Sequence, residues 1–224
     1  MSGGLLPAPG EFVSVFGVKK TGKSSYNRLI FHRWSGDKLC IDVNGDEDPG
    51  PGAIRLAKPL NRWPDEPGPL TLHYVPDWTS KSAKDDLDRA LGMALFPQDR
   101  PVLLWLGEFG RLTDNARPTP YQTTLYQASR HYGPITLLMD QPRAMWVHTS
   151  ALNQTDRFVI FDMPNRDDQD RLADHIGIER VPFRAALRSI HSRGPYWHAV
   201  HDRANPDHAG PPRRLEAMPP LPLG

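Results

Sequence analysis

The residues from Gly17 to Ser24 read Gly-Val-Lys-Lys-Thr-Gly-Lys-Ser, which is a complete Walker A signature. They follow the apolar, strand-like run 12–16 and precede the helix-compatible segment 25–33. In this context of strand, glycine-rich turn and helix, main-chain N–H groups converge on phosphate oxygens and the helix N-terminus adds partial positive charge. The sequence therefore predicts a nucleotide-binding site.

The lysine and the serine that close the signature have distinct chemistry. Lys23 is expected to reach the β- and γ-phosphates, and the Ser24 hydroxyl is expected to hold a metal ion. ATP and Mg²⁺ are therefore the expected cofactors. The residues expected to contact the nucleotide are Gly17, Lys19, Lys20, Thr21, Gly22, Lys23, Ser24 and Ser25.

Composition limits the class of protein. The chain has 224 residues, of which 38% are hydrophobic and 24% are charged, and this suits one soluble α/β domain. The single cysteine, Cys40, excludes an internal disulfide, and no apolar run approaches the roughly 18 residues that span a bilayer. We therefore expect a cytoplasmic protein without a membrane span. The net charge of +1 provides no general attraction for nucleic acid, so any such contact must be local.

Short apolar runs alternate with helix-like segments along most of the chain. The pattern predicts strands at 11–16, 37–43, 70–75, 102–106, 134–139, 157–161 and 196–201, and helices at 24–34, 83–95, 120–132 and 167–176. Residues 44–69 are rich in Gly, Pro and acids and read as an exposed excursion. The alternation predicts a single α/β domain with a mostly parallel central sheet flanked by helices. We expect this domain at 11–203, between a flexible leader at 1–10 and a proline-rich tail at 204–224.

A second candidate catalytic residue follows the most apolar strand. Residues 102–106 read Val-Leu-Leu-Trp-Leu, as in a strand buried on both faces, and Gly107 and Glu108 come next. A carboxylate at the carboxyl end of a core strand is placed to polarise the water that attacks a phosphate. Glu108 is therefore the candidate catalytic base.

Several later motifs, taken in order, resemble those of the HerA–FtsK superfamily of DNA-translocating ATPases. In the conjugative coupling proteins of that family, a strand ends in Asp-Glu-Phe-Gly before a leucine. A helix ending in Arg and Gly, a strand, a Thr-Gln-Arg-Pro-like turn, a glutamine before another strand and a short acid-rich helix then follow. The similar segments of this chain are 106–112, 127–133, 135–139, 140–143, 153–161 and 166–177.

The resemblance covers residues 11–177 and implies a P-loop NTPase of the RecA/ASCE-like type. It implies that copies of the chain form a ring, expected to be a hexamer, that binds ATP between subunits and moves double-stranded DNA. Gln141 would then sense the γ-phosphate. Arg130 would be the arginine finger that reaches a neighbouring nucleotide, with Arg143 as its rival. In a monomer, Arg130 reads more simply as a cation at a helix C-terminus.

The chain departs from this family at the Walker B aspartate, because Gly107 stands there. In the family, the sensor strand lies between the P-loop strand and the Walker B strand. We therefore hypothesise that Asp140 replaces the missing carboxylate from the adjacent strand end, which makes Ser24, Asp140 and Glu108 the candidate metal ligands. Asp42 is a weaker substitute, since its strand is expected farther from the P-loop. Gly107 also raises the prospect of a weak or degenerate ATPase.

Within that family, so small a chain most resembles the genome-packaging ATPases of tailless, membrane-containing phages. The implied partners are double-stranded DNA, further copies of the chain and capsid or portal-vertex proteins, in the host cytoplasm or on the virion. Two other functions stay open. A P-loop small-molecule or nucleotide kinase would use the arginines at 180–193 as a lid, whereas Gly107 favours a non-hydrolysing ATP-binding switch. The same basic stretch is otherwise a solvated helix face or a local DNA contact.

Overall fold

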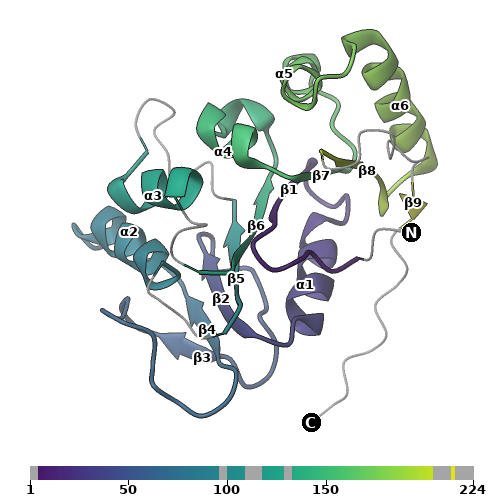
Figure 1. The fold of residues 1–224 in the computed structure, drawn as a ribbon. Coiled ribbons are helices and arrows are strands. Elements are labelled where there is room, and N and C mark those ends of the chain that lie inside the picture. Colours follow the sequence, from purple (N-terminus) through teal and green to yellow (C-terminus); the bar gives the residue numbers. More distant parts are fainter. Residues whose placement is uncertain (1–4, 96–99, 109–117, 129–132, 204–212, 215–224) are drawn as a thin grey trace.

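The strands predicted from the apolar runs lie side by side in one sheet (Figure 1). The computed structural model describes residues 5–95, 100–108, 118–128, 133–203 and 213–214. Within these residues the sheet has nine strands in the order β3-β4-β2-β5-β6-β1-β7-β8-β9. The strands are β1 (Phe12–Phe16), β2 (Asp37–Asp42), β3 (Ile54–Leu56), β4 (Thr71–Tyr74), β5 (Val102–Gly107), β6 (Ile135–Gln141), β7 (Arg157–Ile160), β8 (Trp197–Asp202) and β9 (Arg213–Arg214).

The sheet is mostly parallel, as predicted. Every pairing from β3 across to β7 is parallel, and only the edge strands β8 and β9 pair antiparallel. The helices are α1 (Lys23–Arg33), α2 (Ala83–Met93), α3 (Pro120–Ala128), α4 (Thr149–Gln154), α5 (Arg166–Ile176) and α6 (Arg180–Arg193). A 3₁₀ turn, Ala144–Trp146, precedes α4.

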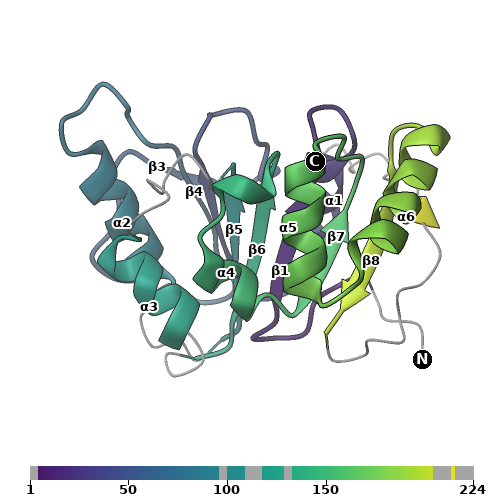
Figure 2. The same ribbon diagram turned by 90° about the horizontal axis from the view of Figure 1, so that it is seen from above.

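Alternation along the strands divides the core into two layers. In β1, Phe12 and Phe16 pack with buried residues of α2 to α6, whereas Val13 and Val15 pack with α1 on the other face. Figure 2 shows the same division, with α2 to α6 in front of the sheet and α1 behind it. Because successive side chains of a strand point to opposite faces, an apolar residue at every position is what a strand covered on both faces requires.

The strand order brings three carboxyl ends together. β6 lies between the P-loop strand β1 and β5, so the ends of β1, β6 and β5 are neighbours at one edge of the sheet. This confirms the predicted placement of the strand that carries Asp140. In open parallel sheets, ligands bind beyond these carboxyl ends.

Some predicted elements differ from the structure. The stretch 44–69 is not wholly exposed, because it contains β3 and the buried Trp63. Helix α4 was not predicted, and its N-cap is His148, whose ring accepts from Ser150 N at 3.2 Å; histidine is not among the usual capping residues. The predicted continuation of α3 to 132 and most of the tail from 204 lie outside the described residues.

The N-terminal segment before β1 contacts the sheet where it is described. Gly10 N donates to Thr136 Oγ1 at 3.0 Å, and Thr136 Oγ1 donates to Ala8 O at 3.2 Å.

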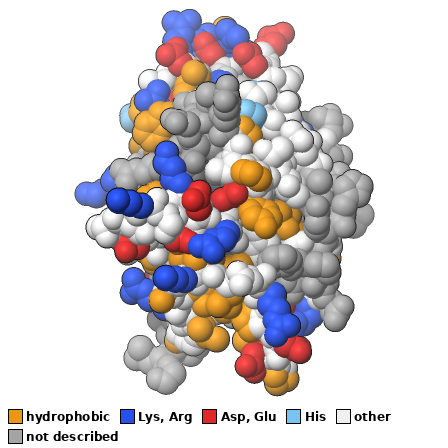
Figure 3. Space-filling view, turned by 90° about the vertical axis from the view of Figure 1, so that its left-hand side faces the viewer, with side chains coloured by type: hydrophobic (Ala, Val, Ile, Leu, Met, Phe, Trp, Pro, Cys, Tyr) orange, Lys and Arg blue, Asp and Glu red, His pale blue; other side chains and the backbone are white. Residues whose placement is uncertain are grey.

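On the face of the molecule shown in Figure 3, basic and acidic side chains are interspersed with hydrophobic ones. This mixture fits the net charge of +1.

Candidate active site

The loop between β1 and α1 has the conformation that only glycine allows at two of its positions. Gly17 has φ +148° and Gly22 has φ +114°. A Cβ at Gly17 would lie 2.7 Å from Phe161 Cβ, and one at Gly22 would lie 2.9 Å from Tyr196 Cδ1. Left-handed backbone and close packing both exclude larger residues here, so the glycines of the signature fix the loop shape.

The first turn of α1 begins without a capping side chain among the described residues, and Gly22 is the N-cap. The main-chain N–H groups at the start of a helix have no partners within the helix and, with the helix dipole, attract negative charge. Residues 22–25 therefore form the helix N-terminus that the Walker A signature predicts after the glycine-rich loop.

Lys23 is held inside the loop. Its ammonium donates to Val18 O at 3.2 Å, and the residue is only 8% exposed. Burial lowers the pKa of Lys23 below its ordinary value, although the carboxylates of Asp140 and Glu108 act in the opposite direction. A buried ammonium that feels the charges of nearby carboxylates suits a site that receives a polyanion together with a metal cation.

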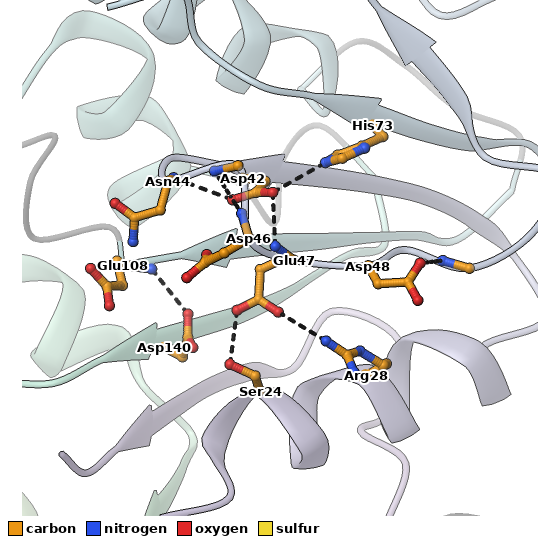
Figure 4. A network of polar contacts seen from close by, with 12 residues as sticks. Ser24, Arg28, Asp42, Asn44, Asp46, Glu47, Asp48, His73, Glu108 and Asp140 are labelled. Carbon is orange, nitrogen blue, oxygen red and sulfur yellow. Dashed lines mark hydrogen bonds and ion pairs between the residues drawn. The ribbon is translucent and has the colours of Figure 1, made fainter. Parts of the chain in front are cut away.

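Asp140 and Glu108 meet at the ends of β6 and β5. Asp140 Oδ1 accepts from Glu108 N at 3.1 Å, and Asp140 is 1% exposed (Figure 4). Burial raises the pKa of Asp140 to about 6, against the opposing effect of Lys23. Glu108 itself has φ +46°, an unusual value for a residue with a side chain and one often found at functional sites.

Glu47 is an acid of this site that the sequence analysis missed. Ser24 Oγ donates to Glu47 Oε1 at 2.9 Å, and Arg28 Nη2 lies 3.7 Å from Glu47 Oε2. Burial raises the pKa of Glu47 to about 7, and the charge of Asp140 acts in the same direction. Glu47 belongs to the stretch predicted to be exposed. A signal was present, since three acids, 46–48, follow within six residues of the end of β2, the strand next to β5.

The carboxylate of Asp42 binds main-chain N–H groups of the following loop and is not placed as a metal ligand. Its carboxylate accepts main-chain hydrogen bonds from 44–47, at 2.7 to 3.3 Å, and lies 3.4 Å from His73 Nε2. Burial alone would raise its pKa, but these hydrogen bonds outweigh burial and hold the pKa of Asp42 below its ordinary value. As predicted, β2 is separated from the P-loop strand, here by β5 and β6. Asp42 therefore orders the loop that carries Glu47.

The remaining predicted site residues lie in different surroundings. Gln141 is fully buried, and neither polar atom of its side chain has a hydrogen-bond partner among the described residues. Arg143 forms an ion pair with Asp168 of α5 and stacks on Trp146. Arg130 lies outside the part of the chain that is described. In the loop, Lys19 and Lys20 are exposed, Thr21 is buried and Ser25 is half-buried.

Tyr196 is a further residue against the loop that sequence reasoning did not single out. Its N–H donates to Thr21 O at 2.8 Å, and its ring lies next to Gly22. It has φ +70° and is 43% exposed. Tyr196 was predicted to begin a strand, but it forms the turn that precedes β8.

The oxygen atoms near Ser24 are suitable ligands for Mg²⁺. Asp140, Glu47 and the Ser24 hydroxyl all present oxygen, the ligand that this hard cation prefers. Across the described ranges, no group of three or more His, Cys, Asp or Glu side chains is placed to hold a metal by itself. Mg²⁺ at nucleotide sites is commonly held by one or two carboxylates together with phosphate oxygens and water. The residues present therefore fit a metal that arrives with a nucleotide.

The mostly parallel sheet, the helices on both faces and the glycine-rich loop after β1 define a P-loop NTPase fold. No protein-family model matches the sequence, and no curated protein is similar enough to match it. In the part of the chain that the structure describes, no helix is long and apolar enough to cross a membrane.

Solved structures of viral packaging proteins share this fold. The genome packaging NTPase of Sulfolobus turreted icosahedral virus 2, in complex with AMPPCP, is 12% identical with a TM-score of 0.66, over 95% of this chain and 100% of that chain. Its complex with AMP is 15% identical with a TM-score of 0.65, over 89% and 96%. The DNA-packaging ATPase of Sulfolobus turreted icosahedral virus is 16% identical with a TM-score of 0.59, over 88% and 94%. At the level of the fold, the predicted P-loop NTPase architecture is confirmed, and it is the fold of these viral genome-packaging NTPases.

Proposed function

We propose that the chain is an ATP-hydrolysing motor that moves double-stranded DNA, of the kind that packages viral genomes. The observation that carries the proposal is the N-terminus of α1, uncapped by any described side chain, with Lys23 near the buried Asp140 at the end of the neighbouring strand. The likeness of the whole fold to viral packaging NTPases supports it.

Each residue of the site has a defined part in phosphoryl transfer. Lys23 and the N–H groups of residues 17–25 bind the phosphates, while Ser24 and Asp140 would hold Mg²⁺. Mg²⁺, when bound, neutralises charge on the phosphates. Glu108, at the end of β5, orients the attacking water and accepts its proton. Gln141 is buried at the end of β6, and its amide atoms have no hydrogen-bond partner in the described part of the chain, so it is the candidate sensor of the γ-phosphate.

The motor proposal includes a ring of subunits, with six as the expected number, and an arginine supplied to the neighbouring nucleotide. Arg130 and Arg143 remain the candidates, and the ion pair of Arg143 with Asp168 must open before Arg143 can serve. Duplex DNA is the proposed cargo, and capsid or portal-vertex proteins are the proposed docking partners. The catalytic domain is proposed to span 11–203.

A second candidate function, a nucleotide-dependent switch without hydrolysis, is favoured by Gly107 alone, since glycine cannot orient metal-bound water. The kinase alternative has less support. On α6, Arg180 and Arg184 form ion pairs with Asp174 and Asp170 of the packed helix α5, so they do not form a free lid.

Phosphate release from ATP with Mg²⁺, measured on the whole chain with and without linear duplex DNA, tests the proposal. We expect turnover that the duplex stimulates, together with a sedimentation mass larger than one chain. Turnover that ignores DNA in a monomeric protein would contradict the motor. ATP binding without turnover would support the switch.

A further inference from the structure

A buried acid from the loop after β2 lies directly over the serine of the P-loop. The Glu47 side chain is 7% exposed, and its Oε1 accepts from the Ser24 hydroxyl at 2.9 Å (Figure 4). Its other oxygen, Oε2, accepts no hydrogen bond from any described residue and lies 3.7 Å from Arg28 Nη2. A carboxylate that is nine-tenths buried with one oxygen incompletely paired is costly unless a cation completes it.

The space that Glu47 approaches is the one that Gly107 leaves open. A Cβ at Gly107 would lie 3.5 Å from Glu47 Cγ and 3.8 Å from Asp140 Oδ1. Gly107 has no left-handed φ, so its backbone would accept a side chain. Two carboxylates from different elements therefore converge where a β5 side chain would otherwise project.

Hydrogen bonds with Asp42 and Trp78 hold the loop that carries Glu47. Asp42 accepts the N–H groups of 44–47, including that of Glu47 at 2.9 Å, and Trp78 Nε1 donates to Val43 O at 2.8 Å. A carboxylate on a loop with these anchors is held in place before a ligand arrives, as a metal ligand requires.

We propose that Glu47 is a metal-binding residue of this site. With Asp140 and Ser24 it supplies oxygen to the Mg²⁺ of the bound nucleotide, from the loop after β2 and not from the end of β5. On binding, the Ser24 hydroxyl and the Glu47 carboxylate exchange their mutual hydrogen bond for contact with the cation. The assignment rests on the proposed ATP site. Under it, Glu47 and Asp140 together replace the carboxylate that is missing at Gly107.

The test compares nucleotide affinity with and without Mg²⁺. A fluorescent ATP analogue is titrated into the whole chain in Mg²⁺ and in EDTA, and Mn²⁺ binding in the presence of nucleotide is followed by electron paramagnetic resonance. We expect the Mg²⁺-dependent gain in affinity, and the bound Mn²⁺, to fall about tenfold to a hundredfold in Glu47→Gln. Asp140→Asn is expected to lose a comparable part. The matched control Glu66→Gln, at an exposed acid of the same stretch, is expected to behave as the wild type.

The double variant Glu47→Gln with Gly107→Asp separates a ligand from a structural residue. The glutamine of the first substitution keeps the shape of the side chain, and the aspartate of the second places a carboxylate in the same space. We therefore expect the Mg²⁺-dependent affinity to return. A double variant as defective as Glu47→Gln would overturn the assignment.

The other outcomes are equally decisive. If Mg²⁺ increases the nucleotide affinity of Glu47→Gln as much as that of the wild type, the metal-binding role of Glu47 is overturned and the ATP site stands. Tighter binding by Glu47→Gln in both buffers would make Glu47 an inhibitory latch on Ser24 and would also overturn the proposal. A wild type that binds no nucleotide overturns both the inference and the proposed function.

Discussion

Replacement of Lys23 by alanine is expected to abolish ATP turnover, with a loss on the order of a hundredfold or more. Lys23 is the buried cation of the loop, and in the proposed mechanism its ammonium neutralises charge on the phosphates. Charge that develops on the transferred phosphate then lacks its fixed positive partner. The measurement is steady-state phosphate release together with the affinity for a fluorescent ATP analogue, with Lys81→Ala as an exposed-lysine control outside the site.

A Lys23→Ala variant that binds and hydrolyses ATP like the wild type would show that the loop at 17–24 is not the site of ATP hydrolysis. The circular dichroism spectrum guards against a trivial loss through unfolding. We expect the native spectrum to persist, because the side chain makes only one hydrogen bond, to Val18 O, among the described residues.

Replacement of Trp105 by alanine is expected to cost about 3–5 kcal/mol in the free energy of unfolding. Trp105 lies in the middle of β5, is fully buried, and has its ring centroid 5.3 Å from that of Phe31 on α1. Its removal leaves a cavity between α1 and β5, the strand that ends at Gly107 immediately before Glu108. Equilibrium urea denaturation measures the cost.

Trp105→Phe is the matched control for that variant. Trp105 Nε1 is buried without a hydrogen-bond partner in the described part of the chain, and an unpaired buried donor costs about 1–3 kcal/mol. Phenylalanine removes this cost and keeps most of the ring, so we expect a clearly smaller loss than in Trp105→Ala. Equal losses in the two variants would show that the ring is not what stabilises this layer.

The sequence predicted the fold well where local pattern decides it. The apolar strand runs, the glycine-rich turn at 17–22 and the alternation with helices each depend on residues close in the chain. Strand β3 was missed because its three residues are too few to show an alternation. Helix α4 was missed because its cap is His148 and its length is only six residues.

The site was only partly predictable for a different reason. The position of Asp140 beside Glu108 follows from strand order, which the family resemblance supplied, and the structure has that order. The contact of Glu47 with Ser24 joins residues 23 positions apart through a loop rich in acids, glycine and proline. Such a stretch reads as solvated, but the hydrogen bonds of Asp42 and Trp78 hold it over the P-loop.

The central claim is that ATP turnover at residues 17–24 moves this chain along duplex DNA. A triplex-displacement assay tests it most directly, because a labelled third strand leaves a linear duplex when a motor passes. With ATP and Mg²⁺ we predict release by the wild type and none by Lys23→Ala or with a non-hydrolysable analogue. Sustained ATP hydrolysis with the third strand still bound would contradict the claim.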